Sequence, residues 1–238
     1  MERTDLSPRI EHAPTESRHG ELAEKTSGRV HQAALREFVR YIEAPTNVLD
    51  LGAGTGAWAA KLIAFGHNVT CIDRNPGDFA LESAHCEYGD LNDDFPSTVK
   101  NRYSAITAIE VIEHLENPRH FLRQCRNLMS DDGILLLTTP NIENVAGRIR
   151  FMLTGNFRMF DRDERLNDPT HILPIQTYMF EKMARDTGLQ ILFHGTSDPN
   201  QEISTRLSRL LCLLATPFLS NVRAGDNHIF ILSKNRPS

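Results

Sequence analysis

Four residues between positions 50 and 56 have the types and the spacing of a cofactor-binding loop. They are Asp50, Gly52, Gly54 and Gly56, in the run VLDLGAGTG. Glycine has no Cβ, so a glycine-rich loop lets the backbone approach a bound molecule closely. Such loops follow the first strand of open parallel sheets and lie beside adenosine-containing cofactors. The sequence therefore predicts a nucleoside cofactor at this loop.

Asp50 discriminates between two kinds of cofactor. Gly52, Gly54 and Ala57 also spell G-x-G-x-x-A, which a dinucleotide-binding fold would offer. A carboxylate two residues before the first glycine would repel a pyrophosphate at close range, but would attract the ammonium and sulfonium groups of S-adenosylmethionine. The pattern therefore favours S-adenosylmethionine over NAD. An Asp that only binds neighbouring backbone amides is the alternative explanation.

Acidic residues also end the next two expected strands. Asp73 in VTCIDRNP can accept hydrogen bonds from both hydroxyls of an adenosine ribose. Asp90 in EYGDLNDDFP can accept from the adenine amino group, with the amide of Leu91 nearby, although an Asp there could also simply form a turn. Three acids after three successive strands are a more specific pattern than any one of them.

A second cluster of chemically active residues lies in AITAIEVIEHLENP and NDPTHILPI. Methyl transfer to a hydroxyl needs a base, and histidine titrates near neutral pH. His114, directly after the fourth expected strand, is the predicted base, and Glu113 and His171 are its predicted helpers. Alternatively, His114 bonds to the backbone and only shapes its loop.

The elements that must position these residues alternate between strands and helices. This order predicts an α/β fold with parallel strands and right-handed crossovers. A first helix is expected to be capped by Ser27 and to end at Pro45. The other expected helices cover 58–65, 79–84, 119–128 and 178–187, and the expected strands cover 47–51, 68–73, 87–89, 104–109, 134–138, 189–194 and 227–232.

In this order, the motifs resemble the class I S-adenosylmethionine-dependent methyltransferase superfamily. The resemblance rests on VLDLGAGTG, VTCIDRNP, EYGDLNDDFP, AITAIEVIEHLENP and DGILLLTTPN, and it covers about residues 27 to 194. It implies a Rossmann-like, seven-stranded, mostly parallel sheet with helices on both faces and an antiparallel last strand.

The same resemblance implies a function and a set of cofactor contacts. The function is methyl transfer from S-adenosylmethionine to a small-molecule acceptor, with a hydroxyl oxygen as the favoured atom. The implied contacts are Asp50 and Gly52 at the methionine part of the cofactor, Asp73 at the ribose, Asp90 and Leu91 at the adenine, and Glu110 beneath the methionine, with Gly54 and Gly56 as further cofactor-binding residues.

The Glu-x-x-Glu-His segment supports a second hypothesis. It also resembles the metal-dependent 2′-O-methyltransferases that act on the 3′ ends of small RNAs. In that family two glutamates and two histidines bind a divalent ion, and the matching set here is Glu110, Glu113, His114 and His171. A net charge of −5, and five Arg against five acidic residues in 141–175, do not favour a nucleic-acid partner. Neither RNA nor a metal ion is the favoured interpretation.

Outside the core, the sequence predicts an arm and an apolar insertion. Residues 1–26 are expected to form a flexible N-terminal arm, which is neither a signal peptide nor a transmembrane anchor, before a single domain over 27–238. The helical insertion at 196–226 contains the apolar run 203–219, which could meet a membrane surface, a second subunit or the protein's own core. This run also motivates a third hypothesis, a regulator or scaffold that binds the cofactor without catalysing transfer.

The insertion at 141–175 is a predicted lid over the acceptor. Val145, Ile149, Met152 and Leu153 fall on one helical face, and this stripe is expected to cover the edge of the sheet and the core. Specificity for the acceptor should therefore lie in this segment.

The four cysteines bear on the cellular compartment. They are Cys71, Cys86, Cys125 and Cys212, scattered in apolar surroundings without a C-x-x-C pair. Such cysteines are typical of buried free thiols in a reducing environment, so the sequence predicts a cytoplasmic protein.

Overall fold

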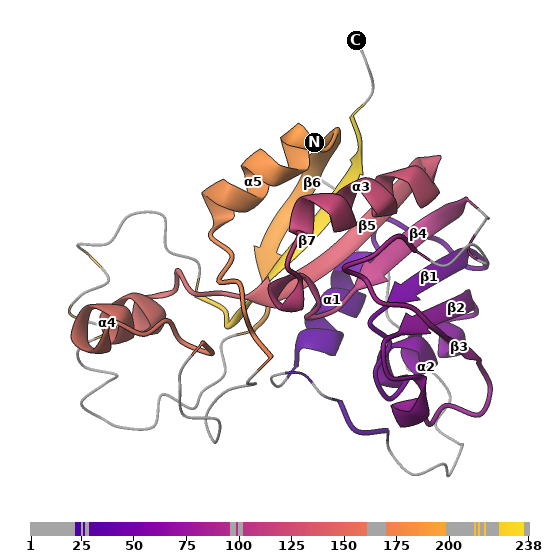
Figure 1. Ribbon diagram of the computed structural model, residues 1–238, viewed down its shortest axis with the longest axis horizontal. Coiled ribbons are helices and arrows are strands. Elements are labelled where there is room, and N and C mark those ends of the chain that lie inside the picture. The colour runs from indigo at the N-terminus through magenta and orange to yellow at the C-terminus, as the bar shows by residue number, and fades with distance from the viewer. Residues whose placement is uncertain are drawn as a thin grey trace, which may run out of the picture.

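The computed structural model contains a seven-stranded sheet with helices on both faces (Figure 1). It describes residues 22–24, 26, 29–95, 99, 102–160, 170–198, 212, 214, 217 and 224–235. The strands are β1 (Asn47–Leu51), β2 (Asn68–Asp73), β3 (Cys86–Tyr88), β4 (Tyr103–Ala108), β5 (Met129–Pro140), β6 (Leu189–Thr196) and β7 (Asn227–Lys234).

The strand order is β3-β2-β1-β4-β5-β7-β6. β7 runs antiparallel to both of its neighbours, and all other pairs are parallel. The predicted α/β fold with an antiparallel last strand is therefore confirmed. Because parallel strands point the same way, the carboxyl ends of β1, β2, β3 and β4 meet at one edge of the sheet.

The helices form a layer on each side of this sheet. Crossover helices cover both faces of a parallel sheet, which is why its strands are apolar almost throughout. The helices are α1 (Val30–Phe38), α2 (Ala57–Ala64), α3 (Pro118–Leu128), α4 (Val145–Thr154) and α5 (Thr177–Asp186), with the 3₁₀ helices η1 (Pro76–Asp78) and η2 (Ile112–His114).

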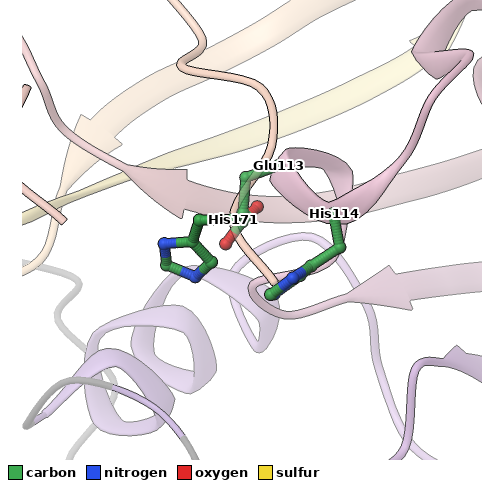
Figure 2. Close-up of side chains that lie close together, drawn as sticks. All are labelled: Glu113, His114 and His171. Atoms are coloured by element: carbon green, nitrogen blue, oxygen red, sulfur yellow. The ribbon is translucent and has the colours of Figure 1, made fainter. Parts of the chain in front are cut away.

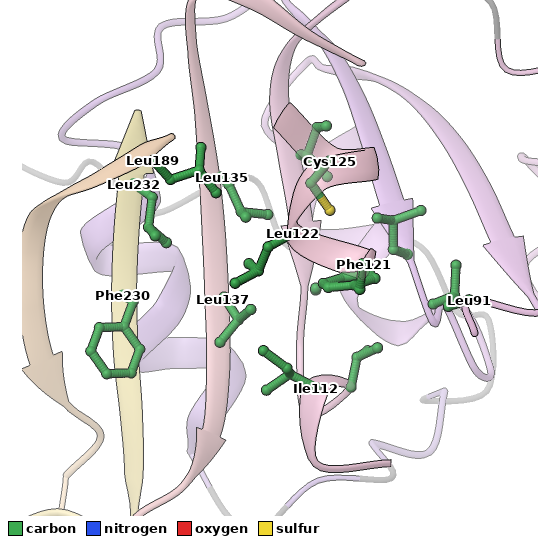
Figure 3. Close-up of a cluster of buried hydrophobic side chains, with 14 of the residues drawn as sticks. Leu91, Ile112, Phe121, Leu122, Cys125, Leu135, Leu137, Leu189, Phe230 and Leu232 are labelled. Atoms are coloured by element: carbon green, nitrogen blue, oxygen red, sulfur yellow. The ribbon is translucent and has the colours of Figure 1, made fainter. Parts of the chain in front are cut away.

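Two apolar clusters, one for each face, hold these layers to the sheet. One contains Phe180 of α5 together with Phe121 of α3. Figure 3 shows Phe121 among its neighbours in this cluster. The other contains Phe38 of α1 and Trp58 of α2. Successive strand residues alternate between them: Leu135 and Leu137 belong to the first and Leu136 to the second. This period of two is the expected geometry of a strand buried on both faces.

The predicted helix over 79–84 is wrong. The chain forms η1 and then turns without a further helix before β3. Phe79 and Leu81 pack on the glycine loop instead, so closely that a Cβ on Gly56 would lie 2.7 Å from Cβ of Leu81. Phe79 and Leu81 are therefore partly buried without forming a helix.

The first helix also begins and ends differently from the prediction. Its N-cap is Arg29, in the left-handed region at φ 69°, and the helix ends at Phe38 instead of continuing to Pro45. Ser27, the predicted cap, lies outside the described residues. The last residues of the predicted arm pack on the domain. Thr55 Oγ1 donates to the carbonyl of Ala23 at 2.8 Å, and Glu24 lies 3.1 Å from Lys61.

The apolar stripe of α4 does not cover the core as predicted. Met152 is 75% exposed and Leu153 is 69% exposed, while the only buried residue of this helix is Gly147. The reason is position: α4 lies beyond the end of the sheet rather than on one of its faces (Figure 1). Asn144 caps the helix, accepting from Gly147 N at 2.7 Å.

Most of the second insertion lies outside the described residues. Between 199 and 223 only residues 212, 214 and 217 are described, so the predicted contact of 203–219 with a membrane, a partner or the core stays a prediction. Across the described part of the chain, no helix combines the length and the apolar character needed to span a bilayer. Cys71, Cys86 and Cys125 are buried free thiols, as expected, and Cys212 is half-buried.

Candidate active site

A cavity of about 580 Å³ lies at the carboxyl ends of β1, β2, β3 and β4. Every residue that the sequence assigned to the cofactor lines it, except Gly56. His114 and His171 line the same cavity, and Glu113 lies next to them. The structure therefore brings the predicted cofactor residues and the predicted catalytic residues to one place.

The glycine loop needs its glycines. Gly52, Gly54 and Gly56 all have positive φ angles, of 74°, 54° and 88°. A Cβ on Gly52 would lie 2.5 Å from Cγ2 of Val111, and no side chain could be accommodated there without displacing that residue. Gly52 N also donates to the carbonyl of Ile72 at 2.8 Å, which fixes the loop to the end of β2.

Asp73 and Asp90 are held by backbone amides at the mouth of the cavity. Asp73 accepts from Gly54 N at 2.8 Å and, with its other oxygen, from Asn75 N at 2.7 Å. Asp90 accepts from Asn92 N at 2.9 Å. These bonds orient each carboxylate while leaving further lone pairs for a ligand, because a carboxylate can accept about four hydrogen bonds.

Asp50 lies deeper and has an unusual pKa. It is 2% exposed, and Thr107 Oγ1 donates to its Oδ1 at 2.9 Å. Burial raises the pKa of Asp50 to about 7, against the opposing effect of the Thr107 hydrogen bond, and the nearby charge of Asp73 adds to the rise. Among the described residues, Oδ2 of Asp50 has no hydrogen-bond partner. A cationic ligand would supply the missing interaction.

Glu110 is the second carboxyl group of the cavity with a raised pKa, and it is half-buried. Its backbone lies in the left-handed region, at φ 55°, a conformation that is costly for a non-glycine residue and recurs at functional sites. Thr138 Oγ1 donates to its Oε1 at 2.8 Å, and Asn227 Nδ2 donates to its Oε2 at 2.5 Å. Burial raises the pKa of Glu110 to about 7, and these two hydrogen bonds oppose the rise.

Glu113, His114 and His171 converge beside the cofactor residues (Figure 2). One ligand atom from each lies within 4.8 Å of the others, and the two imidazole rings are 4.7 Å apart, edge to face. Glu113 is fully buried, and Thr139 Oγ1 donates to its Oε2 at 3.0 Å. The 3₁₀ turn η2 supplies two of the three side chains, so the convergence depends on how residues 170–173 are held.

Backbone hydrogen bonds hold the His171 segment against η2. The amides of Ile172 and Leu173 both donate to the carbonyl of Glu113, at 3.0 and 2.9 Å. Sequence reasoning missed this pairing because the two segments are nearly 60 residues apart. It also missed Asn227 and Thr138, whose only sequence signal is a polar residue in an otherwise apolar strand.

Backbone carbonyls also orient both imidazole rings. His171 Nδ1 lies 2.8 Å from the carbonyl of Met159, and His114 Nδ1 lies 3.1 Å from the carbonyl of Thr170. A carbonyl can only accept, so a hydrogen bond between His171 Nδ1 and the Met159 carbonyl requires the proton on Nδ1. Thr170 Oγ1 also lies 2.8 Å from His114 Nδ1, and a hydroxyl can donate as well as accept. With the proton on Nδ1, either ring could accept a proton or bind a cation through Nε2.

These donors fit a divalent ion, with one correction to the predicted set. Glu113, His114 and His171 offer one oxygen and two nitrogens, and ligating histidines normally donate their other ring N–H to a carbonyl; a carbonyl lies within hydrogen-bond distance of Nδ1 of both rings. Glu110 does not belong to this group, because its carboxylate binds Thr138 and Asn227. Three ligands, not four, come together among the described residues.

The sheet order, the glycine loop and the acids at three strand ends define a class I S-adenosylmethionine-dependent methyltransferase. The chain belongs to the methyltransferase domain family, whose model matches residues 22–193. This match begins at the arm residues that pack on the glycine loop.

Curated relatives are similar to part of the chain. The ubiquinone biosynthesis O-methyltransferase of Glaesserella parasuis is 32% identical over 119 residues, which cover 42% of this chain and 50% of that protein. The one from Bradyrhizobium diazoefficiens is 26% identical over 125 residues, covering 48% of this chain and 49% of that protein. The chain thus spans about half the length of these relatives.

Solved structures share the fold at low identity. A SAM-dependent methyltransferase from Archaeoglobus fulgidus has a TM-score of 0.62 at 17% identity, covering 85% of this chain and 92% of that one. The small RNA methyltransferase HEN1 has a TM-score of 0.58 at 17% identity, covering 94% of this chain and 27% of that one. These likenesses support the fold and do not choose between acceptors.

Proposed function

We propose that this protein transfers the methyl group of S-adenosylmethionine to a hydroxyl oxygen of a small molecule. One observation carries the proposal: His114 lines the cofactor cavity, and Thr170 holds its ring at Nδ1 through the carbonyl at 3.1 Å and the hydroxyl at 2.8 Å. A base in this position is what a hydroxyl acceptor requires.

Each residue of the histidine cluster has a separate role in the proposed methyl transfer. The cofactor supplies an activated methyl group on its sulfonium, so the protein must mainly align the acceptor oxygen with it. His114 Nε2 takes the proton of the hydroxyl. The buried carboxylate of Glu113, close to both rings, favours the imidazolium that forms, and His171 orients the acceptor from the other side.

Relatives suggest which acceptors to try first. Several of them are named ubiquinone biosynthesis O-methyltransferases, so the first acceptors to test are ubiquinone precursors that carry a ring hydroxyl. Such hydroxyls ionise near pH 10, like tyrosine, and are within the range of a histidine base. Met159, Thr170 and His171 of the proposed lid line the cavity, and we place the acceptor beside them.

The three-residue cluster favours a second candidate, metal-dependent methylation of RNA 3′ ends. A divalent ion held by Glu113, His114 and His171 would act as a Lewis acid on the acceptor hydroxyls. This candidate and the first share the fold and the cofactor, and differ in the acceptor and in the need for metal.

Methyl-labelled S-adenosylmethionine distinguishes the candidates. It is incubated with the full chain and either ring-hydroxyl compounds or short RNAs, with and without EDTA. We expect label in the ring-hydroxyl compounds that is unaffected by EDTA. Label in RNA that EDTA abolishes would establish the second candidate, and cofactor binding without any transfer would establish a non-catalytic protein.

Replacing the proposed base gives the first prediction. We expect His114→Ala to lower kcat by about 10²–10⁴-fold without changing the Kd for S-adenosylmethionine, because the base acts only in the chemical step. Activity should partly recover above pH 9, where the acceptor begins to ionise by itself. His120→Ala is the control, since His120 lies on α3 and does not line the cavity. An unchanged kcat in His114→Ala would exclude this role.

A further inference from the structure

Part of the cavity lining is formed by the ends of two helices. His31 in the first turn of α1, and Ala57 and Trp58 in the first turn of α2, all line it. Neither helix has an acidic residue in its first turn, and the N-cap residues Arg29 and Gly56 make no side-chain capping hydrogen bond within the described part of the chain. Uncapped helix N-termini present free N–H groups and partial positive charge, which favours an anionic ligand.

Buried donors at the same place supply an independent observation. Trp58 is 3% exposed, and its indole Nε1 has no hydrogen-bond partner among the described residues. Oγ1 of Thr26, which also lines the cavity, is likewise a buried atom without a hydrogen-bond partner among the described residues. Buried polar atoms of folded proteins nearly always have a partner, so two such donors in one lining point to a ligand that accepts hydrogen bonds.

The neighbouring charges are compatible with an anion. Glu24 is the nearest described acid of the arm, and its carboxylate lies 3.1 Å from Lys61 and 3.3 Å from Nδ1 of His31. Burial lowers the pKa of His31, so this residue contributes its ring, 5.5 Å from that of Trp58, more than a charge. The bond from Thr55 to Ala23 holds Thr26 near the cavity.

We propose that Thr26, Trp58 and the N-termini of α1 and α2 bind the carboxylate of the cofactor's methionine. Asp50 and Glu110 then receive its ammonium and sulfonium groups. The methionine part carries both signs of charge, and the cavity offers a donor-rich region and an acidic region to match. The proposal rests on S-adenosylmethionine as cofactor and not on the acceptor proposed above.

A truncated ligand tests this assignment in the absence of any acceptor. S-Adenosylhomocysteine carries both the carboxylate and the ammonium, and S-adenosyl-3-thiopropylamine lacks only the carboxylate. Calorimetry gives the Kd of each ligand for the full chain and for Trp58→Phe and Thr26→Val, which remove the donors and keep the shapes. We expect each variant to bind S-adenosylhomocysteine roughly 10-fold more weakly and the decarboxylated ligand unchanged, because hydrogen bonds to charged groups are strong.

Thr70→Val is the matched control, since Thr70 lies in β2 and does not line the cavity. It should leave both affinities unchanged. Equal weakening of both ligands in Trp58→Phe and Thr26→Val would show a structural role only, and undiminished binding of S-adenosylhomocysteine would show that the carboxylate lies elsewhere. Either result overturns the proposal. Thermal melting confirms that each variant is folded, and the two variants provide independent readouts.

Discussion

Asp50 and Glu110 have pKa values of about 7 and line the same cavity. Near neutral pH each group is therefore partly protonated in the chain without cofactor. A bound cation favours the ionised form of a nearby carboxyl group. Binding of S-adenosylmethionine should then expel protons, and its affinity should depend on pH.

Below pH 7 the cofactor must displace a proton from each carboxyl group, and the free energy required falls as the pH rises. Affinity for S-adenosylmethionine should therefore increase from pH 5.5 to 7, by up to about 10-fold per pH unit for each proton released. Calorimetry in two buffers of different ionisation enthalpy measures the release directly.

Variants identify the group responsible. Asp50→Asn should bind the cofactor more weakly and show a shallower pH dependence. Thr107→Val removes a hydrogen bond that lowers the pKa of Asp50, so it should move the same rise in affinity to higher pH. An affinity that stays constant from pH 5.5 to 7 in the unchanged chain would contradict this account.

At the scale of elements, β7 connects the C-terminal part of the chain to the cofactor cavity. Asn227, its first residue, donates to Glu110 through its side chain, and its backbone pairs with Ser197. The residue before it, Asp226, is ion-paired with Arg158, which precedes the Met159 carbonyl that orients His171. One strand end thus supports both the cofactor side and the acceptor side.

Asn227→Ala tests this connection. It removes the buried donor to the half-buried carboxyl group of Glu110, which should lower the free energy of unfolding by about 1–3 kcal/mol. The pKa of Glu110 should rise further without this hydrogen bond, so S-adenosylmethionine should bind more weakly at pH 7. Chemical denaturation and calorimetry measure the two effects. The control is Asn68→Ala, whose exposed side chain contacts Asn47 at the start of β1; an equal loss of affinity in both would argue against a specific role for Asn227.

At the scale of the whole molecule, the residues that line the cavity range from Thr26 to His171 in the sequence, and Asn227 donates to one of them, Glu110. If 27–238 is a single domain, as we propose, one ligand should stabilise all of it together. S-Adenosylhomocysteine at 100 times its Kd adds about 2.7 kcal/mol, which corresponds to a rise in Tm of roughly 5–10 °C for a chain of this length. Calorimetric scanning should show one transition that moves as a unit.

Two outcomes would count against that expectation. A second transition that S-adenosylhomocysteine leaves in place would indicate a separately folding part of the chain. A comparable rise in Tm with NAD would contradict the cofactor preference inferred from Asp50.

The fold and half of the site could be predicted because the signals are local. Asp50 and Asp73 lie at the ends of apolar strands, Asp90 and His114 come shortly after two others, and strand ends in a parallel sheet meet at one edge. Thr26 and Asn227 could not be found in this way, because packing between distant segments places Thr26 in the cavity lining and Asn227 beside Glu110. The failed prediction for α4 has the same cause: an amphipathic pattern specifies an apolar face but not what lies against it.

The contact between Gly52 and Val111 has an evolutionary consequence. The cofactor loop and the turn that carries His114 touch with no room for one additional methyl group. A lineage that enlarges position 52 must therefore shrink position 111 and also accept a strained backbone at φ 74°, so both constraints favour glycine at position 52. Substitutions at positions 52 and 111 should therefore be coupled.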